Sequence, residues 1–113
     1  MSDVVTFTLG DEEVTLKLTF LAASRIPKAF GGYMPAIDAV SKLDMSAMEV
    51  IVAHGMGLTP HGQKQMNLPE KIYETGVAKV AAPCVEYLTI LMNGGKRPTE
   101  GDDTGGKESE GEA

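Results

Sequence analysis

Residues 5–32, VTFTLGDEEVTLKLTFLAASRIPKAFGG, decide which fold this chain can adopt. Apolar residues alternate with polar ones on both sides of a polar turn at residues 10–13. This alternation predicts two strands with one buried face, joined as a β-hairpin by residues that tolerate a positive φ. A two-stranded hairpin is marginal in water by itself. Its apolar face must therefore pack on the helices that follow, or on a sheet from another subunit.

The same stretch runs on into a helical pattern. We expect a helix from Thr19, which can act as its N-cap, to Phe30, with Gly31 and Gly32 supplying the left-handed stop. Pro27 lies inside this pattern, where it removes a backbone donor, so we predict a kink or two short turns there. The side chains expected to face inward are Leu21, Ile26 and Phe30.

Short helical patterns follow along the middle of the chain. Residues 33–43 predict one short helix, with Ile37, Val40 and Leu43 on one face. Ser46 and Glu49 fit a capping box for a second helix, which Gly55 and Gly57 should end. Residues 54–65 are polar and rich in Gly and Pro, and they predict a loop.

The last helical region begins at residues 67–70, Asn-Leu-Pro-Glu, which form a helix-start signature. An apolar stripe then runs to Met92, and Gly76 and Pro83 are expected to divide it. Its members are Val77, Val80, Ala81, Cys84, Leu88 and Leu91. The pattern as a whole predicts an α+β fold, in which an N-terminal β-hairpin packs on a small bundle of four to five short helices.

Length and charge limit the function classes that are open to the chain. Its 113 residues suit a single α+β domain at 1–93, followed by a flexible acidic Gly-rich tail at 94–113. A net charge of −6 with scattered basic residues argues against nucleic-acid binding. The first residues resemble no signal peptide, and no run reaches the length of a membrane span. With a single cysteine, these features favour a soluble intracellular protein and no membrane partner.

The histidines, the cysteine and the acidic cluster occur in patterns that indicate structural positions and not a catalytic or metal site. His54 and His61 match no zinc-site spacing, and we interpret them as loop histidines. Cys84 lies on the apolar stripe, where a thiol is inert. Three acids at residues 11–13 belong to a hairpin tip, where water leaves carboxylates poorly suited to catalysis. We therefore expect no enzymatic activity, no metal and no cofactor.

The functional feature that remains as a hypothesis is a protein-binding surface. Methionines at the edges of elements, such as Met34, Met45 and Met66, suit adaptable contacts, whereas Met48 and Met56 suit the core. The candidate surface lies on the first helix and the edges beside it, at Phe20, Ile26, Phe30, Tyr33 and Met34. The alternative interpretation places Phe20, Ile26 and Phe30 in the core.

The order of elements resembles the tail assembly chaperone family of long-tailed bacteriophages and gene transfer agents. The likeness covers about residues 4–92. It rests on the hairpin VTFTLGDEEVTLKLTF, on LAASRIPKAFG in place of the family's L-x-x-[IL]-E-x-x-F-G helix, and on the segments MSAMEVIVAHGMG, NLPEKIYETG and VAKVAAPCVEYLTILM. Pro27 departs from the pattern, because it stands where the family usually has an acid.

The resemblance implies a non-enzymatic protein of the host cytoplasm that acts during virion morphogenesis. Such a protein binds the tape measure protein, the tail tube protein or both, and it can form a homo-oligomer. The alternatives are a structural tail component retained in the virion, such as a tube or adaptor subunit, a small enzyme, and an adaptor unrelated to phage. A tube subunit needs more strand than one hairpin supplies.

Overall fold

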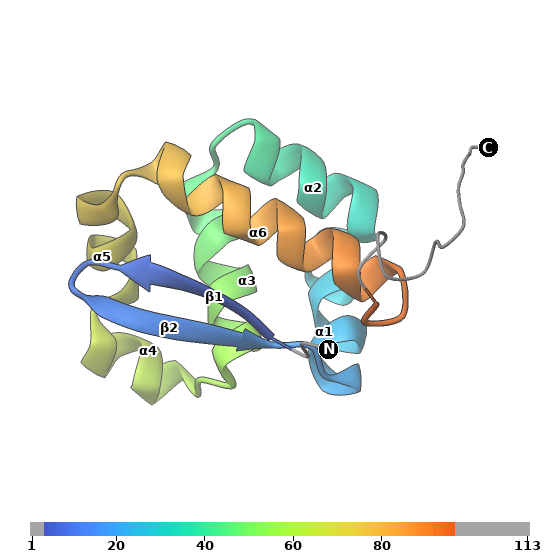
Figure 1. Ribbon diagram of the computed structural model, residues 1–113, viewed down its shortest axis with the longest axis horizontal. Helices are drawn as coiled ribbons and strands as arrows, with labels where there is room; N and C mark the ends of the chain where they lie inside the picture. Colours follow the sequence, from blue (N-terminus) through green and yellow to red (C-terminus); the bar gives the residue numbers. More distant parts are fainter. Residues whose placement is uncertain (1–3, 97–113) are drawn as a thin grey trace.

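The computed structural model describes residues 4–96 and has an α+β fold, an N-terminal antiparallel hairpin followed by six helices (Figure 1). The elements are β1 (Val4–Leu9), β2 (Glu12–Lys17), α1 (Phe20–Phe30), α2 (Tyr33–Ser41), α3 (Met45–Met56), α4 (Pro60–Met66), α5 (Leu68–Thr75) and α6 (Val77–Met92). The acidic tail predicted at 94–113 lies outside the described residues from position 97 onward.

The hairpin forms where the alternation predicts it, with a turn that is shorter than expected. Leu9 pairs with Glu12, so only Gly10 and Asp11 form the loop, and Gly10 has a φ of 66°. A glycine with positive φ at the first central position is typical of a type II′ turn, whose twist matches that of the strands. The register then places Val5 opposite Leu16 and Phe7 opposite Val14 on one face.

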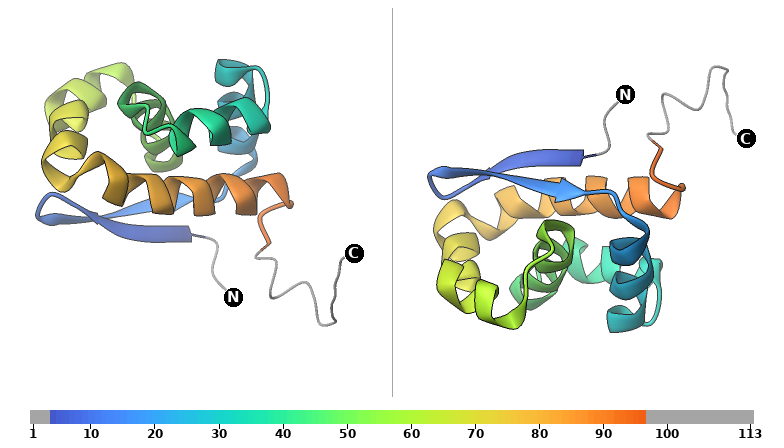
Figure 2. Two further views of the ribbon diagram at one scale, coloured as in Figure 1. Left: turned by 90° about the horizontal axis from the view of Figure 1, so that it is seen from above. Right: turned by 90° about the horizontal axis from the view of Figure 1, so that it is seen from below.

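The apolar face of the hairpin packs on the helices, all of which lie on one side of it (Figure 2). β2 contacts α3, and β1 contacts α6 and α5. Gly55 makes the α3 contact possible, because a Cβ at this position would lie 2.9 Å from Cδ2 of Leu16. The expectation that Gly55 helps to end this helix is therefore wrong: Gly55 is a buried packing position, and Gly57 is the left-handed C-cap.

Pro27 is accommodated in α1 without a break in the helix, contrary to the expected division into short turns. It lies in the last turn, where its missing N–H leaves the carbonyl of Ala23 without its usual donor. The hydroxyl of Tyr33 donates to this carbonyl at 2.7 Å. Thr19 and Gly31 cap α1 as predicted: Thr19 Oγ1 accepts from Ala22 N, and Gly31 is left-handed.

The predicted capping box of α3 is wrong, because the cap lies two residues earlier. Asp44 is the N-cap, and its carboxylate accepts from the amides of Ser46 and Ala47. An aspartate in this position does what was expected of Ser46 and also suits the positive end of the helix dipole. Ser46 and Glu49 therefore lie inside the first turns of α3.

The loop predicted at residues 54–65 is also wrong. His54 belongs to the last turn of α3, and Pro60 begins α4, with Thr59 Oγ1 accepting from Gly62 N as its cap. Proline is well placed in a first turn, where its missing donor has no intrahelical partner anyway. This additional helix brings the total among the described residues to six.

The start expected at residues 67–70 is confirmed, since α5 begins at Leu68. Gly76 divides the last helical region as predicted, and α5 and α6 meet there at a bend of 109°. Pro83 does not divide it, because α6 runs unbroken from Val77 to Met92. The stripe on α6 carries the core: Val80, Cys84, Leu88 and Leu91 are buried, together with Tyr87 and Ile90, which the pattern did not single out.

Candidate functional site

Two of the five predicted surface residues are largely exposed. Phe20 has 86% of its surface accessible and Met34 has 65%. Ile26 is fully buried, which agrees with its core interpretation and leaves it out of reach of a partner. Phe30 and Tyr33 are partly buried and pack against the core, and the hydroxyl of Tyr33 is engaged with Ala23. Burial also raises the pKa of Tyr33 above its ordinary value.

The exposed apolar surface of α1 lies on its first turn. Ala22, Ile26 and Phe30 follow each other at intervals of four, and this stripe faces the core. Leu21 is one position off the stripe, about 100° round the helix, and it is 56% exposed. Its predicted inward orientation is therefore wrong. Phe20 and Leu21 together form an apolar pair that the fold leaves in water.

Leu21, the second residue of this pair, lines a cleft between α1 and the segment where α3 passes into α4, which we call the α1–α3 cleft. Its volume is about 570 Å³. Six apolar residues line it: Leu21, Ala22, Ala53, Met56, Leu58 and Pro60. Flexible thioethers and branched aliphatic groups adapt to a helix laid against them. The cleft can therefore take an apolar stripe of another protein.

The charged residues that line the α1–α3 cleft are all basic. Lys17 and Arg25 contribute positive charges, and His54 faces the same space. No carboxylate belongs to this lining, although the whole chain carries a net charge of −6. Burial, and secondarily the charge of Arg25, lower the pKa of His54 below its ordinary value. The electrostatics of the cleft favour a ligand that carries negative charge beside its apolar groups.

The other candidate residues show structural roles. Cys84 is fully buried on α6, and burial raises its pKa to about 12, so the thiol is protonated and unreactive at neutral pH. No group of three or more His, Cys, Asp or Glu residues within positions 4–96 is placed to hold a metal ion. Glu12, at the hairpin tip, forms an ion pair with Lys71 of α5 at 3.4 Å.

The sequence predicts no binding role for three residues of the cleft. The sequence pattern places Leu21 in the core and His54 in a loop, and Arg25 is one of the scattered basic residues. The four-residue spacing of Ala22, Ile26 and Phe30 was the available signal for Leu21. No signal in the sequence brings His54 to α1, because the contact between α1 and α3 is a tertiary one.

Across positions 4–96, no single helix is long and apolar enough to cross a membrane; only α5 and α6 taken together reach that length and composition, with their sharp bend between them. Comparisons of the chain with protein-family models, with curated proteins and with solved structures find no match.

Proposed function

We propose that this protein is a non-enzymatic assembly chaperone of phage-tail type, which binds the tape measure protein, the tail tube protein or both during tail morphogenesis in the host cytoplasm. The observation that carries the proposal is the exposed pair Phe20 and Leu21 beside the α1–α3 cleft. An apolar groove next to exposed aromatic and aliphatic side chains suits a client that presents an amphipathic helix.

Two further features support this proposal. The hairpin followed by short helices is the order of elements on which the family resemblance rests. The basic lining of the cleft suits a client helix whose apolar stripe is flanked by acidic residues, and a charge-complementary helix would be held in one register. The client is therefore an amphipathic helical segment with acidic flanks.

Co-expression with the candidate clients tests the proposal. We expect a long helical tape measure protein and a tail tube protein among the neighbouring genes. Both should become more soluble when this chain is present, and should co-purify with it. Replacing both Phe20 and Leu21 by Ser should abolish both effects while circular dichroism and the melting temperature stay near those of the parent. Tyr73→Ser is the matched control, since Tyr73 is 71% exposed on α5, away from the cleft.

Two results would contradict the proposal. Unchanged solubility of both clients in the presence of the parent protein would remove the chaperone function. Mass spectrometry of purified particles distinguishes a chaperone from a structural tail component. A high copy number in the virion would identify a structural component, whereas a chaperone is absent from the finished particle.

A further inference from the structure

A second and larger hollow lies along β1, between the hairpin and the exposed face of α6. Its volume is about 1040 Å³, and we call it the β1–α6 groove. Thr6, Phe7 and Thr8 form one wall, and Ala82 and Pro83 lie on the other. The two walls come from β1 and α6, which are in contact in the fold and run beside each other in Figure 1. This groove is separate from the α1–α3 cleft and shares no lining residue with it.

The groove follows the outer edge of β1, which has no strand beside it among the described residues. A two-residue loop is closed by a hydrogen-bonded pair, here Leu9 and Glu12, and bonded and non-bonded pairs alternate along an antiparallel ladder. The backbone N–H and C=O groups of Thr6 and Thr8 therefore point away from β2. Both threonines are exposed.

The edge of β1 lacks three of the features that usually prevent another strand from pairing with it: charged side chains, proline and a bulge. Natural edge strands are protected by charged side chains, proline, bulges or a covering segment. β1 reads VVTFTL, without charge or proline, and its register with β2 contains no bulge. β2, by contrast, carries Glu12, Glu13 and Lys17. Of the two edges, that of β1 is chemically suited to accept a strand.

The charged residues that line the β1–α6 groove indicate which kind of strand would bind there. Carboxylates at Asp11, Glu12, Glu70 and Glu74 line the groove, with Glu86 on α6, against the two lysines Lys71 and Lys79. Glu12 pairs with Lys71, and Asp11, Glu70 and Glu74 outnumber Lys79, so the lining stays negatively charged. Extended backbone that also carries Lys or Arg would meet both the open edge and the carboxylates.

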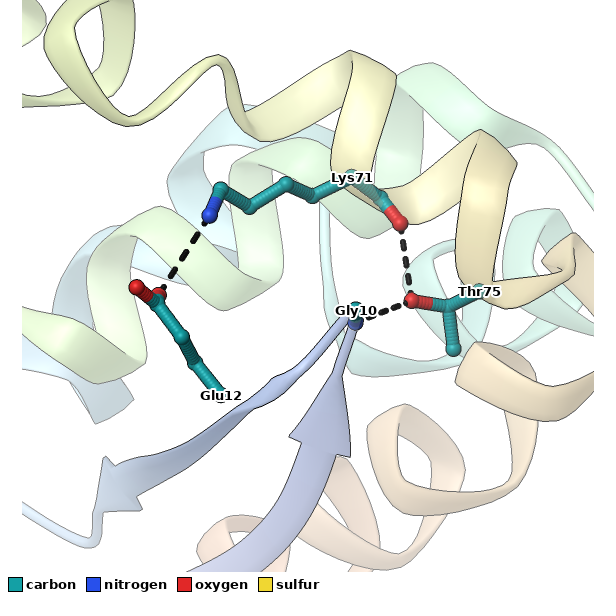
Figure 3. Close-up of polar contacts among 4 residues, drawn as sticks. All are labelled: Gly10, Glu12, Lys71 and Thr75. Atoms are coloured by element: carbon teal, nitrogen blue, oxygen red, sulfur yellow. Dashed lines mark hydrogen bonds and ion pairs between the residues drawn. The ribbon is translucent and has the colours of Figure 1, made fainter.

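The end of the groove at the hairpin tip is held in place by contacts with α5 (Figure 3). Gly10 N donates to Thr75 Oγ1 at 2.6 Å, and this hydroxyl donates in turn to the carbonyl of Lys71 at 2.8 Å. Nζ of Lys71 reaches Oε1 of Glu12 at 3.4 Å. An edge fixed in this way loses little conformational entropy when a strand binds to it.

We propose that the β1–α6 groove docks an extended segment of a partner protein that bears Lys or Arg, and that this segment adds to the outer edge of β1 as a third strand. The same charges disfavour the two other occupants. Residues 97–113 contain six acidic and two basic residues, so the chain's own C-terminal segment would be repelled. A second copy paired edge to edge would place two acidic grooves together.

The test uses a fluorescein-labelled peptide of five Lys-Val repeats as the probe, with five Glu-Val repeats as its matched comparison. We expect the Lys-Val peptide to bind the full chain in an anisotropy titration, more weakly as salt is raised, and the Glu-Val peptide not to bind. Hydrogen exchange followed by NMR should show the amides of Thr6 and Thr8 becoming protected as the peptide is added.

Variants separate the backbone contribution from that of charge. Thr8→Pro should weaken binding by at least about tenfold, because it removes an outward N–H and places a ring on the docking edge. Thr8→Val keeps the amide and should bind like the parent. Glu70→Gln combined with Glu74→Gln leaves the strands unaltered and should weaken binding several-fold at low salt, which keeps the test decisive if Thr8→Pro fails to fold.

Several outcomes would overturn the proposal. These are failure of the Lys-Val peptide to bind, equal binding of the Glu-Val peptide, or full binding by the double Gln variant at low salt. Protection of Thr6 and Thr8 without peptide would assign the edge to a different occupant. Loss of that protection on dilution would identify a second copy, and its loss on deletion of residues 97–113 would identify the chain's own C-terminal segment.

Discussion

Tyr33 completes the hydrogen bonding of α1 at the point where Pro27 interrupts it. A carbonyl left without a donor in a partly buried place costs about 1–3 kcal/mol, so the hydroxyl that reaches Ala23 offsets much of the penalty of the proline. Pro27 is therefore matched by a residue six positions further on. Tyr33, which the sequence places on the candidate binding surface, thus has a structural contact within the fold.

We predict that Tyr33→Phe lowers the free energy of unfolding by about 1–2 kcal/mol, measured by urea denaturation. Tyr73→Phe, at an exposed position on α5, should change it by less than about 0.5 kcal/mol. Adding Pro27→Ala supplies a new amide donor to the carbonyl of Ala23. It should raise stability more in the Tyr33→Phe background than in the parent, and equal effects would show that the two residues are not coupled.

Gly55 is a second position at which the fold requires a particular residue, because α3 and β2 approach closely there. We predict that Gly55→Ala lowers the free energy of unfolding by about 1–3 kcal/mol, because the new methyl group would overlap Leu16. Gly62→Ala is the matched helical control, with its nearest contact at 3.4 Å, and should be neutral or stabilising by up to about 1 kcal/mol. Equal effects of the two variants in thermal denaturation would contradict this interpretation.

At the scale of elements, the hairpin and α5 act as one unit through Thr75. Its hydroxyl accepts from the hairpin turn and donates within α5, so it joins two elements that lie 65 residues apart in sequence (Figure 3). This contact orders the end of the β1–α6 groove. The sequence gives no indication of it, since a threonine in the last turn of a helix is ordinary.

We predict that Thr75→Val lowers the free energy of unfolding by about 1–2 kcal/mol and speeds hydrogen exchange at the amide of Gly10. Thr89→Val is the control: its hydroxyl bonds only to the carbonyl of Val85 in the preceding turn of α6. The control should leave exchange at Gly10 unchanged. Slow exchange at Gly10 in Thr75→Val would mean that the hairpin tip is held by other contacts.

At the scale of the whole molecule, the core contains two ionisable side chains, Tyr87 and Cys84, whose pKa is raised by burial. Tyr87 is fully buried and donates to the carbonyl of Lys17 at 2.5 Å, which links α6 to the end of β2. Burial, and secondarily the neighbouring Tyr33, raise the pKa of Tyr87. Burial raises that of Cys84 from 9.0 to about 12.

These shifts predict that the protein loses stability in alkaline solution. Above about pH 9 the unfolded chain releases the proton of Cys84, whereas the folded chain keeps it until about pH 12. The unfolded state is therefore favoured progressively in this range, by up to about 1.4 kcal/mol per pH unit for each such group. Below pH 9 this contribution is fully present.

Urea denaturation at a series of pH values checks this prediction. The parent should show a free energy of unfolding that falls between pH 9 and 11, and Cys84→Ala should show a shallower fall over the same range. The comparison uses slopes, because loss of the thiol also alters packing and so lowers stability at neutral pH. Parallel curves for the two proteins would contradict the assignment to Cys84.

Local patterns predicted the hairpin, the limits of α1, the start of α5 and the break at Gly76, because alternation, caps and glycines act over a few residues. They failed at α3 and α4. There, Asp44 caps α3 two residues before Ser46, and a segment rich in Gly and Pro forms a helix that Thr59 caps.

The sequence by itself determined the two strands, the core stripes of α1 and α6 and the negative charge of the chain, since each depends on the order of side chains along one element. Only the tertiary structure decided which apolar residues remain in water and which charges meet. Leu21, Arg25 and His54 line one cleft because α1 packs on α3, and the carboxylates of α5 lie along β1 because the hairpin tip binds Thr75. Such groupings depend on contacts between distant elements, which no local pattern encodes.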